Sequence, residues 1–500
     1  MNGDFRHTLG TVKQPAFDDA DLFELGRFMA PATNIPFPVF DKNKEDLTLA
    51  ANHEGGALIE GLEAKLADSA LSSIPAGFTY LGQFIDHDIT FDSRSEREAI
   101  VDRPWNVSST SDVENLRVPF FNLEQLYGSN NGRTAERDPD DDDSLLLSPT
   151  MAQVNANQEF LSDLPRNNDG IAVIVDRRND ENLLVAQVQV MFSKLHNSVV
   201  RELRRRSVGG DLFERAKKIM IRHYQKMIHD DFLPRFVDDD AVEEVKEKIK
   251  SGSESFFKPS KSDPYLPIEF SVGAFRICHS MIRNSYSFNR LHQSPKANLH
   301  DLFRLTRKRL GSSWIPDWRR FFELGEHTPE NFNFAKAFTV QFASLLGSLP
   351  KVKDGDEKAR SLASLDLVRA NSRGIASGEL IATEMRNYYD VPEYDPDLIA
   401  SHLPENLRER MRRRTPFLFY LLAESEISSA GAKFGRLGGL IFGETILRLL
   451  AISPHSISEV PLGEDDDLIL VDDPQRVEMR DLLGFIARNS PETDELNLLG

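Results

Sequence analysis

Apolar positions recur at helical spacing through most of the chain after residue 70. The most regular stretch, residues 181–205, places four apolar side chains on one helix face: Leu184, Val188, Met191 and Leu195. Asp180 directly before this stretch is a candidate N-cap. Similar patterns predict helices at residues 211–230, 242–251, 270–282, 332–346, 378–388, 416–429 and 438–451. Strand signals are few and short, so the sequence predicts a mainly α fold.

The first seventy residues differ from the rest. They are rich in Pro, Asn, Asp and Gly and show little sustained periodicity. We expect residues 1–70 to form an arm that wraps over a single domain, residues 71–500. A chain of 500 residues could hold more than one domain. However, the Ser-, Lys- and Pro-rich stretch at 252–267 predicts a loop before a helix, and no segment predicts a linker.

Composition and charge narrow the partners. With 40% hydrophobic and 28% charged residues, the chain can bury a sizeable core. A formal net charge of −19 argues against nucleic acid and anionic membranes as main partners. Much of the acid excess lies in two runs, residues 138–143 and 464–467, and such runs usually mark solvated loops. A divalent-ion site in the first run is the alternative.

The compartment is predicted from what the chain lacks. Cys278 is the only cysteine, so no intramolecular disulfide can form. The first residues carry no apolar stretch of signal-peptide type, and no apolar run has the length of a bilayer span. We expect a cytoplasmic protein by default, with export without a leader as the alternative. The sequence indicates no oligomeric state.

The first segment with chemical potential is residues 82–88, Gly-Gln-Phe-Ile-Asp-His-Asp. Gln83 and His87 are four residues apart and share a helix face, with Asp86 alongside, whereas Asp88 lies on another face. The helix is otherwise apolar, so these polar side chains need partners if they are buried. The alternative is a buried histidine that is paired with a neighbouring carboxylate.

Three other segments place charged or ionisable residues in apolar surroundings. Arg178 lies in a charged stretch, residues 176–182, where helix capping alone could explain the charges. His279 lies in an otherwise apolar helix, where a histidine is more often a satisfied core residue than a ligand. Asp366 is an isolated acid among apolar residues.

The residue types and their order are more informative than any one segment. An acid-flanked histidine is followed along the chain by an arginine, a buried histidine and a buried acid. Activation of peroxide at haem requires these four functions. A distal base moves a proton between the peroxide oxygens, and a nearby cation stabilises the developing charge. A proximal histidine ligates the iron, and an acid on its other nitrogen raises its basicity.

These segments resemble the motifs of the animal-type haem peroxidases, the peroxidase–cyclooxygenase superfamily. Residues 82–88 are similar to the distal-helix motif. The resemblance continues through Leu126-Tyr127-Gly128-Ser129, residues 178–181, His196-Asn197, Ala274-Phe275-Arg276 with His279, and residues 437–444. It covers roughly residues 75–450. Residues 369–378 and 415–439 look like those of bacterial members, so a source outside animals is expected.

The resemblance implies a role for each residue in catalysis. It makes His87 the distal acid–base, Gln83 its neighbour in the pocket and Arg178 the distal cation. His279 becomes the axial ligand of the haem iron. The implied activity is reduction of hydrogen peroxide through a ferryl intermediate and oxidation of a small organic or halide donor.

The resemblance also implies which residues bind haem b. Asp86 and Glu181 match the two carboxylates that form ester bonds to haem methyl groups in animal members. Arg276 and Arg369 match residues that pair with the haem propionates, which suits the fork of two donors that arginine presents. His196 matches a motif residue outside the catalytic set and is expected to be structural.

Two positions depart from the family pattern. Asn182 stands where the family has a methionine that makes a third covalent link, so a sulfonium bond is excluded here. The extreme halide-oxidising potential associated with that bond is therefore in doubt. Asp366 replaces the usual asparagine partner of the proximal histidine. A carboxylate there should push imidazolate character onto His279 and lower the reduction potential of the iron.

A calcium loop is a further expectation from the resemblance. The matching positions are Asp88, Val118, Phe120, Asn122 and Glu124. Val118 offers only its carbonyl where the family also uses a hydroxyl, and Asn122 replaces an acid. Oxygen ligands with two carboxylates still suit calcium. A metal-free loop held by hydrogen bonds is the alternative.

Three other functions compete with a peroxidase. A fatty-acid dioxygenase or peroxygenase of the cyclooxygenase branch needs a tyrosine three residues before the proximal histidine, where this chain has Arg276. A non-catalytic adhesion module would not need His87, Arg178 and His279 together. A metal-dependent hydrolase built on residues 86–88 leaves Arg178 and Asp366 unexplained. The sequence does not name the reducing substrate.

Overall fold

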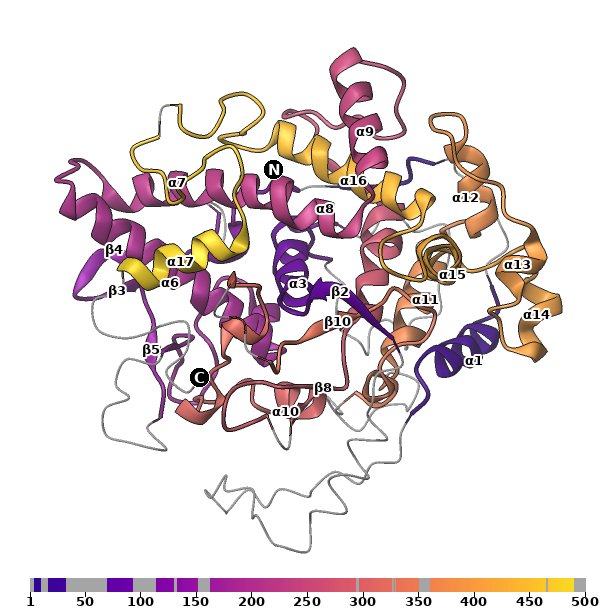
Figure 1. Cartoon of the computed structure of the whole chain (residues 1–500), viewed down its shortest axis with the longest axis horizontal. Coiled ribbons are helices and arrows are strands. Elements are labelled where there is room, and N and C mark those ends of the chain that lie inside the picture. Colours follow the sequence, from indigo (N-terminus) through magenta and orange to yellow (C-terminus); the bar gives the residue numbers. More distant parts are fainter. Residues whose placement is uncertain are drawn as a thin grey trace, which may run out of the picture.

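The computed structural model describes residues 4–9, 17–32, 70–92, 114–129, 133–151, 162–293, 296–325, 328, 330–349, 360–464 and 466–489. These residues are mainly helical, as the periodicity predicts (Figure 1). The α-helices are α1 (Asp19–Met29), α3 (Gly77–Ile89), α5 (Glu124–Tyr127), α6 (Leu183–Arg205), α7 (Leu212–Met227), α8 (Leu233–Phe236), α9 (Asp239–Ser251), α10 (Leu299–Arg304), α11 (Leu362–Ser372), α12 (Gly378–Met385), α13 (Pro396–Ala400), α14 (Glu405–Met411), α15 (Phe417–Ser429), α16 (Arg436–Ile452) and α17 (Met479–Asn489).

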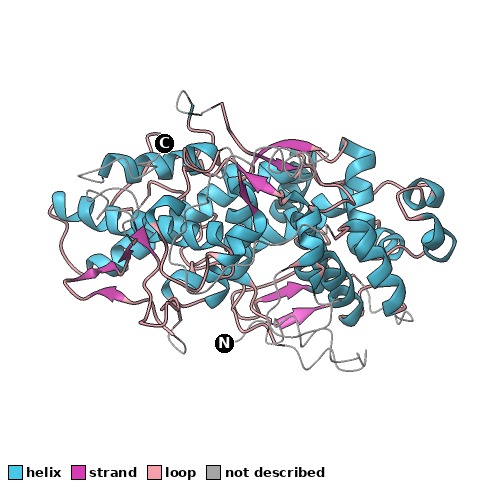
Figure 2. Cartoon of the chain, turned by 90° about the horizontal axis from the view of Figure 1, so that it is seen from below, coloured by secondary structure: helices cyan, strands magenta, loops and turns pink. Residues whose placement is uncertain are grey.

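The strands are short and pair two by two, and Figure 2 shows them scattered among the helices. The pairs are β1 (Asp4–Arg6) with β7 (Tyr265–Pro267), β2 (Leu71–Pro75) with β10 (Phe334–Lys336), β3 (Arg137–Asp138) with β4 (Asp141–Leu145), β5 (Ser148–Pro149) with β6 (Ser162–Asp163), and β8 (Ser285–Tyr286) with β9 (Ala297–Asn298). The pair β1–β7 is parallel and the others are antiparallel. Within the described ranges, no helix combines the length and the apolar character that crossing a membrane requires.

Tighter or wider helical turns connect several of these elements. Those of 3₁₀ type are η2 (Arg177–Asp180), η5 (Arg276–Met281), η6 (Ser312–Trp314), η7 (Trp318–Arg320) and η9 (Ser344–Ser348). Those of π type are η3 (Ile228–Phe232) and η4 (Phe270–Ala274). Such irregular turns are frequent at functional sites.

The helix α3 lies in the middle of the molecule (Figure 1) and packs against α6, η2 and η5. Every residue of α3 except Gln83 is buried. A helix that is surrounded on all sides must satisfy its polar side chains inside the protein. The motif of residues 82–88 therefore lies at the centre of the fold, and Gln83, which is partly exposed, lines a cavity.

The described parts of the N-terminal region join the same core as the rest of the chain. The strand β1 runs parallel to β7, with Asp4 opposite Tyr265, and α1 packs along α11. Leu22 and Leu25 of α1 are fully buried. The boundary between an arm and a domain at residue 70 stays a prediction, and residues 33–69 lie outside the described residues.

The predicted N-cap of the long helix is wrong. The helix α6 begins at Leu183, and its cap is Asn182, whose side-chain oxygen accepts the Leu184 N–H at 2.9 Å. Asp180 belongs to the preceding turn η2 and accepts two hydrogen bonds from Arg166, at 2.7 and 2.9 Å. The same residue that replaces the family's methionine thus has a structural task here.

The helix predicted at residues 332–346 is also wrong. This segment forms β10, then a stretch without regular secondary structure, and only the turn η9 is helical. In the irregular stretch, burial alternates with a period of two: Phe338, Val340 and Phe342 are buried, and the residues between them are less so. Apolar residues spaced by two also match some positions of a helical pattern, so the periodicity alone does not separate the two structures here.

The predicted helix at residues 270–282 is helical but not an α-helix. It consists of the π turn η4 followed by the 3₁₀ helix η5. A 3₁₀ helix has about three residues per turn, so residues i and i+3 eclipse each other. Arg276 and His279 are three apart, and this winding places both on one face.

The described residues of the two acidic runs are largely exposed, as expected of solvated segments, but some of their carboxylates also make ion pairs. Asp141 and Asp143 both accept hydrogen bonds from Arg204. In the second run, the Asp466 side chain is fully buried and pairs with Arg222 at 2.5 Å. Among the described residues, no group of three or more His, Cys, Asp or Glu side chains is arranged to hold a metal ion.

Candidate functional site

One cavity brings together every residue that the sequence predicts for a haem pocket. Its walls come from α3, η2, η5 and α11, with Phe5 of β1 also contributing. The predicted residues that line it are Gln83, Asp86, His87, Arg178, Glu181, Arg276, His279, Asp366 and Arg369. They come from segments almost 290 positions apart in the chain, so the fold rather than local sequence assembles the site.

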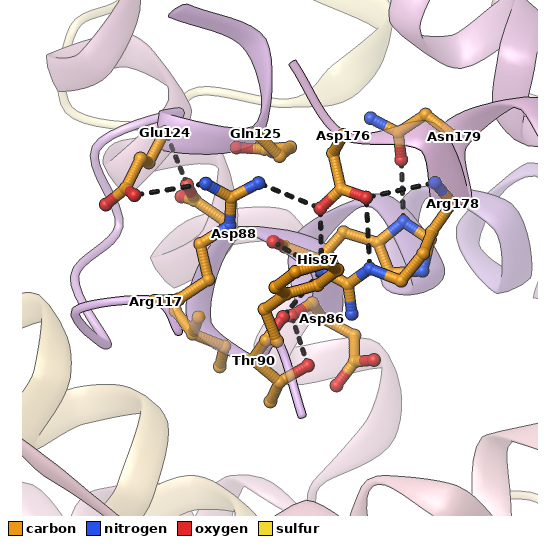
Figure 3. Close-up of polar contacts among 12 residues, drawn as sticks. Asp86, His87, Asp88, Thr90, Arg117, Glu124, Gln125, Asp176, Arg178 and Asn179 are labelled. Atoms are coloured by element: carbon orange, nitrogen blue, oxygen red, sulfur yellow. Dashed lines mark hydrogen bonds and ion pairs between the residues drawn. The ribbon is translucent and has the colours of Figure 1, made fainter. Parts of the chain in front are cut away.

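His87 is buried, and its ring is oriented by an asparagine that sequence reasoning treated as part of a cap. Its Nδ1 lies 2.6 Å from Asn179 Oδ1 (Figure 3). The Asn179 amide donates in turn to Gln189 at 2.7 Å, which fixes the amide oxygen toward the ring. Because an amide oxygen can only accept, Nδ1 carries the proton and Nε2 keeps a lone pair. Burial and then the nearby Arg178 lower the pKa of His87 to about 4, so the ring is neutral at pH 7.

Arg178 is fixed by one carboxylate and by the end of a helix. Its Nε and Nη2 donate to Asp176 at 3.0 and 2.7 Å, and Nη2 also reaches the carbonyls of His87 and Thr90. Those carbonyls belong to the last turn of α3, where backbone acceptors lack helical partners and the helix dipole favours a cation. Nη1 has no partner among the described residues, and the side chain lines the cavity. A rigid positive charge therefore lies beside the His87 ring.

His279 has the carboxylate partner that the sequence predicts. Its Nδ1 lies 2.6 Å from Asp366 Oδ2, and the Asp366 side chain is almost fully buried. Nδ1 is therefore engaged in a hydrogen bond, and Nε2 stays available to bind a ligand. His279 also lines the cavity. The neighbouring Cys278 thiol has a pKa well above its ordinary value because it is buried, so it is not a thiolate.

The two carboxylates expected to bond to haem differ in environment. Asp86 is buried, and one of its oxygens lies 3.4 Å from Arg276 Nη2. Its other oxygen, Oδ1, is buried without a hydrogen-bond partner among the described residues. Glu181 is about half exposed and lies 3.9 Å from Arg307. Both line the cavity.

Positive charge gathers at one part of the cavity wall. Arg276, Arg369 and Arg373 all line it, and Arg373 is paired with Asp92. Arg369 has no hydrogen-bond or ion-pair partner among the described residues. Burial and then Arg276 lower the pKa of Arg369, and the nearby carboxylates of Asp92 and Asp366 offset this only in part. An anionic ligand group would suit such a guanidinium, whose two parallel N–H donors can bind both oxygens of one carboxylate.

These features fit haem. The unpaired Arg369 suits a propionate, and the unpartnered Asp86 Oδ1 lies where a covalent or polar contact with the ligand is possible. His279 offers an imidazole nitrogen that is backed by a carboxylate, which is the usual arrangement of a metal-binding histidine.

The residues of the predicted calcium loop come together, but their oxygens are engaged with hydrogen-bond donors. The Asp88 carboxylate accepts the backbone N–H groups of residues 122, 123 and 124, at 3.1, 3.0 and 2.6 Å. The carbonyls of Val118 and Phe120 accept the N–H groups two residues further along. Glu124 pairs with Arg117 at 3.0 Å. As arranged, these groups do not fit a calcium ion.

His196 lies outside the cavity, as expected of a structural residue. Its Nδ1 lies 2.9 Å from the Tyr127 hydroxyl, and its Nε2 lies 3.0 Å from the Asp143 carbonyl. Both ring nitrogens are therefore satisfied. Burial lowers the pKa of His196 to about 4.

Sequence reasoning missed four residues that shape the site: Arg117, Asp176, Asn179 and Arg373. Asp176 and Asn179 were visible beside Arg178, but capping explained them equally well, and Asp176 does accept the Arg178 N–H. Arg117 lies 61 positions before Arg178 and carries no local signal. Only the fold reveals that it shares a carboxylate with the distal arginine.

Comparisons with known proteins bear on the family and the fold. The model of a family described as animal haem peroxidase matches residues 109–377. Over 119 residues the chain is 29% identical to a peroxidase-like protein of Margaritifera margaritifera. That match covers 22% of this chain and 14% of the relative, so the chain spans a small part of that relative's length.

Solved structures with the same fold come from two kinds of enzyme. Peroxidase A of Dictyostelium discoideum superposes with a TM-score of 0.50 at 15% identity, over 80% of this chain and 83% of that one. A fatty acid alpha-dioxygenase of Oryza sativa superposes with a TM-score of 0.54 at 14% identity, over 86% and 78%. At such identities the likeness establishes the fold and leaves the reaction open.

Proposed function

Because this chain belongs to the animal haem peroxidase family, we propose that it is a haem peroxidase that reduces hydrogen peroxide and oxidises a small organic or halide donor. The observation that carries the proposal is the single cavity that holds two differently supported histidines. His87 is kept neutral beside a fixed guanidinium, and His279 is backed by a buried carboxylate. One suits proton transfer and the other suits metal ligation.

Haem, when bound, supplies the redox-active iron at which the O–O bond of peroxide breaks. His279 would hold that iron through Nε2, while Asp366 accepts the Nδ1–H and strengthens the imidazole as a donor. Arg276 and Arg369 would hold the propionates. Residues on η5 and α11 would thereby orient the haem.

His87 would transfer the proton, and Arg178 would stabilise the negative charge that develops as the peroxide bond breaks. The free lone pair on His87 Nε2 can take a proton from one peroxide oxygen and deliver it to the other, which is the leaving oxygen. Asn179 holds the ring in the required tautomer. Arg178 presents its positive charge without having to reorganise, because Asp176 and two backbone carbonyls already fix it.

Asp86 and Glu181 are proposed to form ester bonds to the haem. Each bond would join a carboxylate oxygen to a haem methyl carbon with loss of two hydrogens. Hydrogen peroxide is the oxidant, and it is reduced to two waters for each ester formed. The buried, unpartnered Oδ1 of Asp86 supports this proposal. A third link has no candidate, since Asn182 is occupied in capping α6.

A fatty-acid dioxygenase is the second candidate, because the solved structures of similar fold include enzymes of that name. Arg276 supports the peroxidase proposal, since it stands one 3₁₀ turn before His279, where the oxygenating branch needs a tyrosine. The deciding experiment supplies the haem-loaded protein with hydrogen peroxide plus a phenol or halide, and separately with palmitate plus oxygen. Oxidation of the donor supports the proposal. Oxygen uptake with the fatty acid alone contradicts it.

A further inference from the structure

Arg117 is a buried cation at the join between the loop of residues 118–124 and the distal site. Its Nη1 donates to Glu124 at 3.0 Å and its Nη2 donates to Asp176 at 2.9 Å. Figure 3 shows the guanidinium lying between these two carboxylates. Its side chain is about 10% exposed, and that of Asp176 is fully buried. One guanidinium thus connects the loop to the segment that carries Arg178.

Asp176 passes this connection to the distal arginine. Its Oδ1 accepts the backbone N–H and the Nε of Arg178, both at 3.0 Å. Its Oδ2 accepts Nη2 of Arg178 at 2.7 Å as well as Nη2 of Arg117. Charge-assisted hydrogen bonds of this kind are the strong ones, and the carboxylate has two cations to hold it in place. The orientation of Arg178 therefore depends on a carboxylate that Arg117 helps to fix.

The loop itself is built to hold an anion. Leu123 adopts a left-handed conformation with φ of 57°, which side chains rarely adopt. This bend turns three successive N–H groups, those of residues 122 to 124, onto the Asp88 carboxylate. Such concavities of N–H groups attract anions and repel cations. A metal ion beside Asp88 would face these donors.

The remaining oxygens are too few for calcium. Calcium takes about six to eight oxygen ligands. In the loop, Asn122 Oδ1 is buried and without a partner among the described residues. The carbonyls of Val118 and Phe120 each already accept one N–H, and one oxygen of Glu124 already accepts Arg117. Arg117 and Arg178 already balance the charges of Glu124 and Asp176. The Asp88 carboxylate is held instead by the three N–H groups.

We propose that Arg117 is the structural cation of this loop, in place of a metal ion, and that it positions Arg178 through Asp176. The first half concerns the protein alone. The second half rests on the proposed function, because it assigns Arg178 to the distal side of a bound haem. Arg117 is a positioning residue, since it does not line the cavity.

The metal half is tested on the wild-type protein without haem. The protein is dialysed against EDTA, its calcium content is measured by elemental analysis, and thermal unfolding is followed with and without added calcium chloride. We expect calcium far below one ion per chain and the same unfolding temperature in both buffers. One calcium ion per chain, or a rise in unfolding temperature on adding calcium, would overturn the proposal.

The positioning half is tested by fluoride binding to the ferric haem protein, followed by optical titration. A small anion at the iron should be stabilised by Arg178, so Arg178→Gln is the reference for complete loss of the distal charge. We expect Arg117→Gln to weaken fluoride binding by roughly tenfold, about the effect of one charged hydrogen bond, and Arg117→Lys to weaken it less. Unchanged binding in Arg117→Gln would overturn this half.

Arg222→Gln is the matched control. It breaks an ion pair that is equally buried, with Asp466, but Arg222 does not line the cavity. Arg222→Gln should lower the unfolding temperature and leave fluoride binding unchanged. If this control also weakens fluoride binding, the effect of Arg117→Gln is general destabilisation, and the proposal is overturned. If neither the wild type nor any of the variants binds haem, the proposed function fails. The calcium measurements on the haem-free protein still decide the metal half.

Discussion

At the scale of single residues, the protonation state of His87 has a consequence for pH dependence. Burial and Arg178 lower its pKa to about 4, against an ordinary value of 6.5. A distal base must be neutral to accept a proton, and a lowered pKa keeps it neutral down to more acidic pH. We expect the rate of the first spectral change of the haem protein after mixing with peroxide to stay constant from pH 8 to about 5.5 and to fall with a midpoint near 4. Stopped-flow mixing by pH jump measures it, and a midpoint near 6.5 would contradict the assignment.

Asn179 sets the tautomer of His87, and its substitution should be visible in the same profile. Asn179→Asp places a carboxylate on Nδ1, which favours the charged ring and raises the pKa of His87. The acidic limb of the rate profile should therefore move to higher pH. Asn179→Ala should slow the reaction by ~10-fold without moving the limb upward, because it removes the orienting bond. A profile of Asn179→Asp identical to that of the wild type would show that this contact does not govern His87.

The ester proposal concerns two carboxylates of unequal exposure. After peroxide turnover, the haem of the wild-type protein should stay with the polypeptide in acid–acetone extraction. The double variant Asp86→Asn, Glu181→Gln should release all of it, since amides cannot form these esters. Asp86→Asn alone should still retain haem through Glu181. Complete extraction from the turned-over wild type would reduce both residues to polar neighbours.

At the scale of elements, a buried glutamate of α15 contacts the start of α16, and a glycine leaves room for its side chain. Glu424 of α15 accepts the N–H groups of Leu437 and Gly438 in the first turn of α16, at 2.9 and 3.3 Å. A Cβ on Gly435 would lie 2.3 Å from the Glu424 side chain. We expect Gly435→Ala to destabilise the protein by ~1–3 kcal/mol, because the carboxylate must leave these donors. Gly209→Ala is the control, since its Cβ would meet nothing within 4 Å. Urea unfolding measures both, and equal midpoints would contradict this account of the contact.

Elements with regular periodicity were predictable, and irregular ones were not. The spacing of apolar residues located α6 and α16, because each packs a continuous face against the core. The helix predicted at residues 332–346 does not form because Phe338, Val340 and Phe342, spaced by two residues, are buried in the core next to β10. The π and 3₁₀ turns around His279 were likewise beyond prediction, since their winding depends on what packs around them.

At the scale of the whole molecule, some residues of the site can be predicted from family motifs, and others become apparent only from the fold. The motifs identified His87, Arg178 and His279, and the fold brings them to one cavity. The support of these residues is a matter of long-range contact. The family resemblance supplies the pairing of Asp366 with His279, 87 positions apart, whereas only the fold shows that Arg117 reaches Asp176 across 59 positions. A single sequence carries no signal for such pairs when neither member belongs to a local pattern.

The central claim is that this cavity binds haem through His279 and uses it to react with peroxide. The most direct measurement is an optical titration of the purified protein with haem, for the wild type and for His279→Ala, followed by addition of hydrogen peroxide. We predict one haem per chain with a Soret band that changes on peroxide addition in the wild type. In His279→Ala, the band should be lost or should depend on added imidazole. A wild-type spectrum in His279→Ala, unchanged before and after peroxide, would contradict the account.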